Sequence, residues 1–159
     1  AEIVGYGMSG DAFHITAPPE DASGAVRAMR ATLQDAGVHP TEVDYINAHG
    51  TSTPANDRIE TKAIKAVFAE HAYKLAISSS KSMTGHLLGA AGGLEAGISA
   101  LVLRDQEIPP TINLEACDED MQDLTFVTSA HQHATQHVLC NGFGFGGVNA
   151  ALIVSSMER

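Results

Sequence analysis

Short apolar runs divide this chain into expected strands, and stretches with apolar residues three and four positions apart lie between them. The expected strands are residues 3–8, 43–47, 75–79, 124–127, 138–140 and 150–154. A helix is expected after each of the first three strands, and further strands close the chain. This order predicts an α/β fold with a mainly parallel mixed sheet and helices on both faces.

Two of the expected helices have boundary signals in the sequence. Ser23 is a candidate cap for a helix that runs to Ala36, and Gly37 ends it. Pro54 and the polar residues after it open a second helix, whose apolar stripe reaches Phe68. Because each stripe occupies one side of its helix, each helix is expected to cover the sheet with that side.

The third helix is expected over about residues 84–103, and its pattern differs from the other two. Between Leu87 and Leu103 nearly every side is apolar or small, apart from the single carboxylate of Glu95. A helix of this kind is buried all round, whereas one sheet covers only one side. The pattern therefore predicts a central buried helix and a second layered unit against its far side.

Composition limits the partners and the compartment. The chain is 44% hydrophobic and 18% charged, which is typical of a globular protein. Its 19 acidic and 9 basic residues give a net charge of −10, which argues against nucleic-acid binding. No apolar stretch has the length of a membrane span and no signal peptide opens the chain. Two cysteines are too few for a disulfide scaffold, so the cytoplasm or an organelle matrix is expected.

His49 stands where an expected strand ends and a polar turn begins, which is where ligand sites of α/β sheets lie. Gly50 permits close approach of a ligand. Thr51 and Thr53 offer two hydroxyls along the same edge. A lone histidine at a strand end is more often a core residue satisfied by backbone, but this position favours a site.

His86 is expected in the first turn of the third helix, with Ser82 or Thr84 as candidate cap. The positive end of the helix dipole disfavours protonation there. A neutral imidazole can donate one hydrogen bond to a developing oxyanion. The alternative is a solvent-exposed histidine near a helix cap.

Lys81 and Glu95 are expected to pair, directly or through water. A buried carboxylate needs a partner, and Glu95 is the only carboxylate in the apolar third helix. The alternative is a surface lysine and a glutamate that points outward. No Gly-x-x-x-x-Gly precedes Lys81, which excludes a phosphate-binding loop.

The segment from Gly142 to Gly147 satisfies the pattern Gly-x-Gly-x-x-Gly, but a strand follows it instead of a helix, which excludes a dinucleotide site. We expect a flexible tight turn, in which Phe145 can swing as a gate and backbone N–H groups can form an oxyanion hole. No metal site is expected at His131, His133 and His137, which are loosely spaced without a nearby carboxylate or cysteine.

Neither cysteine has the surroundings of a nucleophile. Cys140 is expected in the core, in a strand before the glycine turn, and Cys117 lies in an acidic loop. Neither stands at a helix N-terminus, which would lower the pKa of the thiol.

Three segments together carry a family resemblance: residues 47–57 around His49, residues 80–92 around Lys81 and His86, and the glycine-rich residues 140–149. They resemble the C-terminal half of a β-ketoacyl-acyl-carrier-protein synthase of the elongating synthase II type. The resemblance implies one half of a thiolase-like fold. Residues 1–156 are then the half-domain, residues 157–159 a tail, and the N-terminal half with the nucleophilic cysteine is absent from this chain.

The resemblance implies a decarboxylative Claisen condensation of malonyl-carrier protein with an acyl-enzyme thioester. His49 and His86 are implied as the pair that polarises the malonyl thioester carbonyl and stabilises its enolate. Lys81 is implied as the charge that organises this pair, with Glu95 as its neighbour. The chain alone is expected to be inactive in condensation because it lacks the nucleophilic cysteine.

The resemblance also implies the substrate contacts and the partners. Thr51 and Thr53 are implied in holding the pantetheine arm, and Phe145 as the gate whose backbone N–H contributes to the oxyanion hole. The implied partners are acyl carrier protein, the N-terminal half and a second copy in a homodimer. No redox cofactor or catalytic metal is expected, since the substrates arrive on phosphopantetheine.

Three alternatives stay open from the sequence. A polyketide ketosynthase has the same motifs, and a non-catalytic subunit could pair with a cysteine-bearing synthase. A scaffold does not require the intact His-His-Lys set, which counts against the subunit. A generic acyl-thioester-binding module would bind pantetheine thioesters without decarboxylating them.

Overall fold

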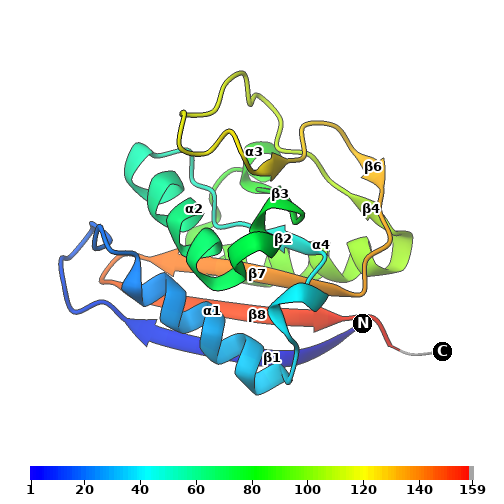
Figure 1. The fold of residues 1–159 in the computed structure, drawn as a ribbon, viewed down its shortest axis with the longest axis horizontal. Coiled ribbons are helices and arrows are strands. Elements are labelled where there is room, and N and C mark those ends of the chain that lie inside the picture. The colour runs from blue at the N-terminus through cyan, green and yellow to red at the C-terminus, as the bar shows by residue number, and fades with distance from the viewer. Residues whose placement is uncertain (158–159) are drawn as a thin grey trace.

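A six-stranded sheet in the order β1-β8-β7-β2-β3-β5 forms the centre of the molecule in the computed structural model, which describes residues 1–157 (Figure 1). Its strands are β1 (Glu2–Gly10), β2 (Tyr45–Asn47), β3 (Ala76–Ser78), β5 (Thr125–Phe126), β7 (His137–Gly144) and β8 (Val148–Ser155). A separate antiparallel pair consists of β4 (Glu107–Ile108) and β6 (His131–Gln132).

The sheet is mixed, as predicted. Strands β7, β2, β3 and β5 run parallel, and β8 is antiparallel to both of its neighbours, β1 and β7. The last two strands are longer than their apolar runs predicted. Pairing continues from Cys140 through Gly144, which faces Val148, because the antiparallel partner supplies ladder hydrogen bonds to glycines of low strand propensity.

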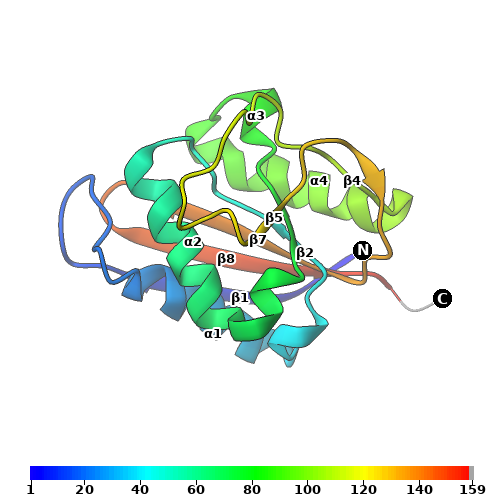
Figure 2. The ribbon, with the colours of Figure 1, turned by 45° about the horizontal axis from the view of Figure 1, so that its top comes forward.

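Helices cover both faces of the sheet (Figure 2). Helix α1 (Ser23–Ala36) packs on β1 and β8, and α2 (Pro54–Phe68) lies beside α1. Helix α4 (Ala91–Asp105) packs on β7 and β8 from the other side. The short 3-10 turns η1 (Pro40–Glu42) and η2 (Ala69–Tyr73) precede β2 and β3.

The bounds of α1 match the prediction, but its cap differs. Gly37 ends the helix in the left-handed region at φ 65°, as expected for a glycine there. Ser23 does not cap the helix; the N-cap is Ala22, without a side-chain hydrogen bond. Instead the Ser23 backbone N–H donates to Oδ1 of Asp21 at 2.9 Å. The carboxylate two residues before Ser23 thus satisfies the first N–H of the helix, whereas no side chain caps it at Ala22.

The continuous helix expected over residues 84–103 is wrong in its first part. The chain forms α3 (Lys81–Thr84), then η3 (Leu88–Ala90), and α4 begins only at Ala91. Gly85 at φ 73° and Leu88 at φ 53° are incompatible with a right-handed helix, so they break it.

Helix α4 is also not buried all round in this chain. Its buried residues are Ala91, Glu95, Ser99, Val102 and Leu103. Leu94 and Leu101 on the other side are 37% and 47% exposed. One side therefore lacks cover, which is the geometry that a half-domain predicts.

Within residues 1–157, none of the helices combines the length and the hydropathy that crossing a membrane requires. Strand β8 ends at Ser155, and Met157 after it is exposed. Of the expected tail, residues 158–159 lie outside the described part of the chain.

Candidate active site

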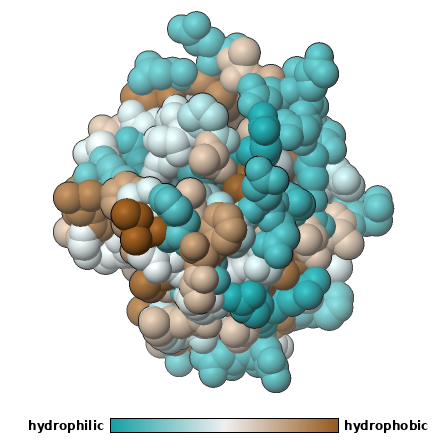
Figure 3. All heavy atoms as spheres, turned by 90° about the vertical axis from the view of Figure 1, so that its left-hand side faces the viewer, coloured by the Kyte–Doolittle hydropathy of each residue, from teal (hydrophilic) through white to brown (hydrophobic). Residues whose placement is uncertain are grey.

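The three motif segments meet at one edge of the sheet, because β2, β3 and β7 are parallel and the motifs follow their carboxyl ends. The rings of His49 and His86 are 5.5 Å apart between centroids, edge to face. Phe143 at the end of β7 lies 5.7 Å from the His49 ring. Figure 3 views the molecule from the side at which β7 ends. Hydrophilic residues dominate the right of this face, and apolar ones gather toward its left.

His49 is buried, with 7% of its surface exposed. Burial lowers the pKa of His49 to about 3, and the nearby charges of Lys81 and His86 act in the same direction. The imidazole is therefore neutral at physiological pH. This is the protonation state in which a histidine donates a hydrogen bond without carrying a fixed charge.

Glu60 of α2 fixes the backbone at His49, and it is not among the site residues predicted from the sequence. Its carboxylate accepts from the N–H groups of His49 at 2.9 Å and Gly50 at 2.8 Å. It also accepts from Nδ2 of Asn141 on β7 at 3.0 Å. Burial raises the pKa of Glu60, and these donors oppose the shift. Its position four residues before the buried Ile64, on the apolar stripe of α2, is the signal that could have identified it.

Lys81 and Glu95 form a direct ion pair, as predicted, with side chains 5% and 4% exposed. The pair joins α3 to α4. Burial raises the pKa of Glu95, and the hydrogen bond and charge of Lys81 oppose the shift. Asn47, at the end of β2, donates from Nδ2 to the Glu95 backbone oxygen at 3.4 Å. The ion pair is thereby tied to the strand that carries His49.

His86 is exposed and lies in the turn between α3 and η3, not in the first turn of the long helix. The prediction that a helix dipole disfavours its protonation is therefore wrong. Neither Ser82 nor Thr84 caps α4, because both hydroxyls donate to carbonyls of the preceding turn. Nδ1 of His86 accepts from the Leu88 N–H at 3.1 Å. The neutral ring consequently carries its proton on Nε2, which remains available to a ligand.

Thr51 and Thr53 lie side by side, with 3.0 Å between their hydroxyl oxygens. Their placement along one edge is confirmed. Thr53 also caps α2, because its Oγ1 accepts from the Asn56 N–H at 3.4 Å. Both threonines line a hollow of about 650 Å³ that reaches His49 and His86.

The glycine turn is a tight connection between β7 and β8, as predicted. Gly146 and Gly147 adopt φ values of 83° and 72°, which favour glycine. Phe145 projects from the turn, is 79% exposed and lines the same hollow.

Residues between Asp11 and Pro18 form another wall of this hollow, although the sequence predicted only a loop there. The Asp11 N–H donates to the Gly147 oxygen at 2.8 Å, and Nδ2 of Asn149 donates to Oδ1 of Asp11 at 2.7 Å. The Gly146 N–H donates to the Ile15 oxygen at 2.8 Å. The glycine turn is thus held against a segment more than 130 residues away in sequence.

Within residues 1–157 no group of three or more histidine, cysteine or carboxylate side chains is placed to hold a metal ion. The rings of His131 and His133 are 6.1 Å apart, and Nδ1 of His137 instead contacts the Ser155 hydroxyl at 2.7 Å. Cys140 is buried, as expected, and burial raises the pKa of its thiol to about 12.

Known structures define the class of the fold. The chain aligns over 99% of its length with a β-ketoacyl synthase from Burkholderia phymatum, at a TM-score of 0.92 and 38% identity, and covers 38% of that chain. It aligns equally well, at a TM-score of 0.95 and 36% identity, with a structure of a type II polyketide acyl-carrier protein in complex with its ketosynthase, covering 99% of this chain and 39% of that one. The fold is thus that of one half of a thiolase-like ketosynthase.

The sequence comparisons define the family. Residues 1–115 match the model of the β-ketoacyl synthase C-terminal domain. The chain is 58% identical over 156 residues to 3-oxoacyl-[acyl-carrier-protein] synthase 2 of Coxiella burnetii, covering 98% of this chain and 37% of the relative. It is 51% identical to the enzyme of the same name from Vibrio cholerae, and the match covers 99% of this chain and 38% of that relative. The chain therefore belongs to the β-ketoacyl synthase family, as its C-terminal domain, and spans less than two fifths of these relatives.

Proposed function

We propose that this chain is the C-terminal part of a 3-oxoacyl-[acyl-carrier-protein] synthase, an acyltransferase that elongates fatty acids by decarboxylative Claisen condensation. The observation that carries the proposal is the pair of imidazoles, His49 and His86, 5.5 Å apart at the carboxyl edge of the sheet. Two neutral donors at this separation can both reach the oxygen of one thioester carbonyl.

In the proposed reaction the malonyl thioester carbonyl lies between the two rings. The bond to the carboxylate carbon breaks, carbon dioxide leaves, and the electron pair moves into the enolate. Nε2–H of His86 and the neutral ring of His49 donate to the enolate oxygen. The enolate carbon then attacks an acyl thioester on a cysteine outside this chain, and that thiolate leaves as the new carbon–carbon bond forms.

Lys81 acts in this scheme as a positioning residue. Its ammonium is buried, paired with Glu95, and lies close enough to lower the pKa of His49. The charge therefore adds to the larger effect of burial in keeping His49 neutral, and it favours the negative charge that develops on the enolate. Glu95 holds the lysine in place from α4.

Thr51 and Thr53 are proposed to hold the pantetheine arm, because their adjacent hydroxyls line the hollow that leads to the histidines. Phe145 is proposed as the gate of this hollow, with its backbone N–H in the oxyanion hole of the condensation step. The 79% exposure of its side chain leaves the ring room to change position.

The proposed chemistry needs no redox cofactor, since no electrons pass to an acceptor outside the substrates. The proposed partners are an acyl carrier protein, an N-terminal cysteine-bearing half and a second copy in a homodimer, and the proposed location is the cytoplasm or an organelle matrix. Identities of 51–58% to two enzymes named 3-oxoacyl-[acyl-carrier-protein] synthase 2, against 36% to the polyketide ketosynthase, favour fatty-acid elongation over the polyketide alternative.

A chimera tests the proposal directly. Residues 1–156 replace the matching segment of the Coxiella burnetii relative, and the chimera is given acyl- and malonyl-carrier protein. We expect release of carbon dioxide and a 3-oxoacyl product two carbons longer. The chimera with His86→Ala is expected to load the acyl group but not to decarboxylate, and His131→Ala, at an exposed histidine, serves as control. A folded chimera that forms no product, or that decarboxylates without both histidines, would overturn the proposal.

A further inference from the structure

The imidazole of His49 is not held by a hydrogen bond to any described residue. The Glu60 carboxylate accepts only from the backbone N–H of His49 and does not reach the ring. The torsion that turns a histidine ring has a broad energy profile, so it does not select one orientation by itself. The proposed chemistry nevertheless requires the ring of His49 to point at one oxygen atom. Packing must therefore fix the orientation of this ring.

Two other rings contact His49. The ring of His86 is 5.5 Å away with an angle of 84° between the planes, and the ring of Phe143 is 5.7 Å away at 56°. Both separations lie in the range at which aromatic side chains pack. His86 belongs to an exposed turn, so it restrains its neighbour weakly. Phe143 is half-buried and also packs against the apolar core between the sheet and helices α1 and α2.

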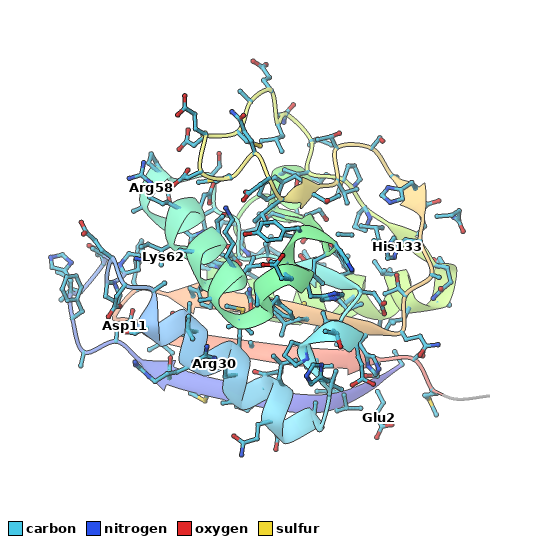
Figure 4. All side chains as sticks on the ribbon, viewed as in Figure 1. Glu2, Asp11, Arg30, Arg58, Lys62 and His133 are labelled. Atoms are coloured by element: carbon cyan, nitrogen blue, oxygen red, sulfur yellow. The ribbon has the colours of Figure 1, made fainter. Side chains whose placement is uncertain are left out.

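The backbone of Phe143 is fixed as well. Strand β7 still pairs with β8 at this point, where Phe143 faces Asn149. Nδ2 of Asn149 donates to Oδ1 of Asp11 at 2.7 Å, and Figure 4 shows Asp11 directly after β1, on the side of the molecule at which β7 ends. Of the two rings that contact His49, Phe143 is therefore the rigid one.

Phe143 also limits the access of water to His49. The histidine is 7% exposed although it borders a hollow of about 650 Å³, and Phe143 lines the same hollow. A phenyl ring in contact with the imidazole occupies space that water would otherwise fill. Burial is the largest cause of the lowered pKa of His49. Phe143 consequently helps to keep the imidazole neutral.

The charged and titratable groups that border His49 or this hollow come from other elements than β7. They are Glu60 of α2, Lys81 of α3, His86 in the turn after α3, Glu95 of α4 and Asp11 after β1. A substitution of Phe143 therefore changes the packing and hydration of His49 and leaves these groups in place.

We propose that Phe143 is a positioning residue, which holds the His49 imidazole in its productive orientation and excludes water from it. The inference rests on the proposed function, and it adds a residue that acts through His49. Without the phenyl ring the imidazole can turn and water can reach it. Decarboxylation should then slow, and the pKa of His49 should rise toward its reference value. Binding of the substrate arm at Thr51 and Thr53 should not change.

The test uses the Coxiella burnetii chimera with Phe143→Ala. The matched control is Phe126→Ala, because Phe126 at the end of β5 is another half-buried phenylalanine against the same core, and its ring does not pack on His49. The histidines of each protein are labelled with carbon-13, and the His49 resonance is assigned by its loss in His49→Asn. Between pH 8 and pH 5 this resonance should stay constant in the unsubstituted chimera and in the control.

In Phe143→Ala the His49 resonance should titrate with a pKa above about 5. The kcat for malonyl decarboxylation should fall about tenfold, while the KM stays nearly unchanged. Phe143→Leu should restore most of both properties, because leucine is still bulky and apolar.

A folded Phe143→Ala variant in which the His49 resonance does not titrate would overturn the proposal, and so would an equal titration in Phe126→Ala. Phe143→Val repeats the comparison if the alanine variant does not fold. Failure of the proposed function has a different signature. The unsubstituted chimera would then be inactive, whereas the titration of His49 would still report on Phe143.

Discussion

Replacing Glu95 by glutamine isolates the cost of the buried ion pair. The substitution keeps the shape of the side chain but leaves the Lys81 ammonium, 5% exposed, without a counter-charge. Breaking a buried pair in this way costs about 3–5 kcal/mol of folding free energy. Lys81 can avoid carrying an uncompensated charge by losing its proton. From a reference pKa of about 10.4 this costs about 4.6 kcal/mol at pH 7 and about 1.9 kcal/mol at pH 9. The cost of deprotonating Lys81 therefore sets an upper limit on the stability lost in Glu95→Gln, and this limit falls as the pH rises.

The sign of the pH dependence follows from this limit. In Glu95→Gln the pKa of the folded-state Lys81 is lowered, so the unfolded chain binds more protons below pH 10, and the variant regains stability as pH rises. Urea unfolding, monitored by circular dichroism at pH 7, 8 and 9, gives the difference in the free energy of unfolding between the variant and the unsubstituted chain. We expect a loss of about 3–5 kcal/mol at pH 7 that shrinks to below about 2 kcal/mol at pH 9.

The matched control is the exposed pair Arg104–Asp105, in which Asp105→Asn should leave the stability almost unchanged at every pH, because solvent screens the two charges. The double variant Lys81→Met, Glu95→Leu should cost much less than Glu95→Gln, because no charge is left buried. A Glu95→Gln variant that loses less than 1 kcal/mol, or whose loss does not change with pH, would refute the reasoning.

Three further predictions follow from the site. The folded pKa of His49 near 3 lies below its reference of 6.5, so stability is lost as pH falls through that window, by about 1.4 kcal/mol per pH unit. Urea unfolding at pH 7 and pH 5 should show this loss of stability in the unsubstituted chain and not in His49→Asn. An equal loss in both proteins would contradict the prediction. Glu60→Gln replaces one acceptor oxygen by a donor facing backbone N–H groups, and should destabilise the chain by about 1–3 kcal/mol. Thermal unfolding measures this, and a loss below about 0.5 kcal/mol would show that the carboxylate is not needed there. The uncovered side of α4 should make the isolated chain self-associate or bind a hydrophobic dye, and Leu94→Glu with Leu101→Glu should reduce both. A monodisperse, dye-free chain in sedimentation and fluorescence measurements would contradict that expectation.

The sequence predicted best where one local signal decides the outcome. Helix α1 begins and ends where expected, because one apolar stripe and Gly37 determine it. The motif segments met at one edge because parallel strands bring their carboxyl ends together. The Lys81–Glu95 pair was predictable because a single carboxylate in an apolar helix has to find a cation.

Contacts between segments that are distant in the chain could not be predicted from the sequence. The role of Glu60 depends on how α2 crosses β2 and β7, which brings its carboxylate to His49 and Asn141. The break before α4 does not follow from the sequence, because Gly85 fits a helix of small and apolar residues as well as a turn; its φ of 73° ends α3. The same error placed His86 inside a helix.

The two histidines are held by different kinds of contact, and this difference affects how the site is completed. His49 is buried and its backbone is fixed by Glu60, which is itself tied to β7. His86 lies in an exposed turn, and its ring contacts the backbone only two residues away. Leu88, two residues further on in η3 and directly before α4, is 73% exposed. Any unit that covers α4 must therefore also pack against the turn that positions His86. We infer that a unit covering this apolar surface also holds the turn that carries His86, so that its assembly completes the proposed pair of histidines.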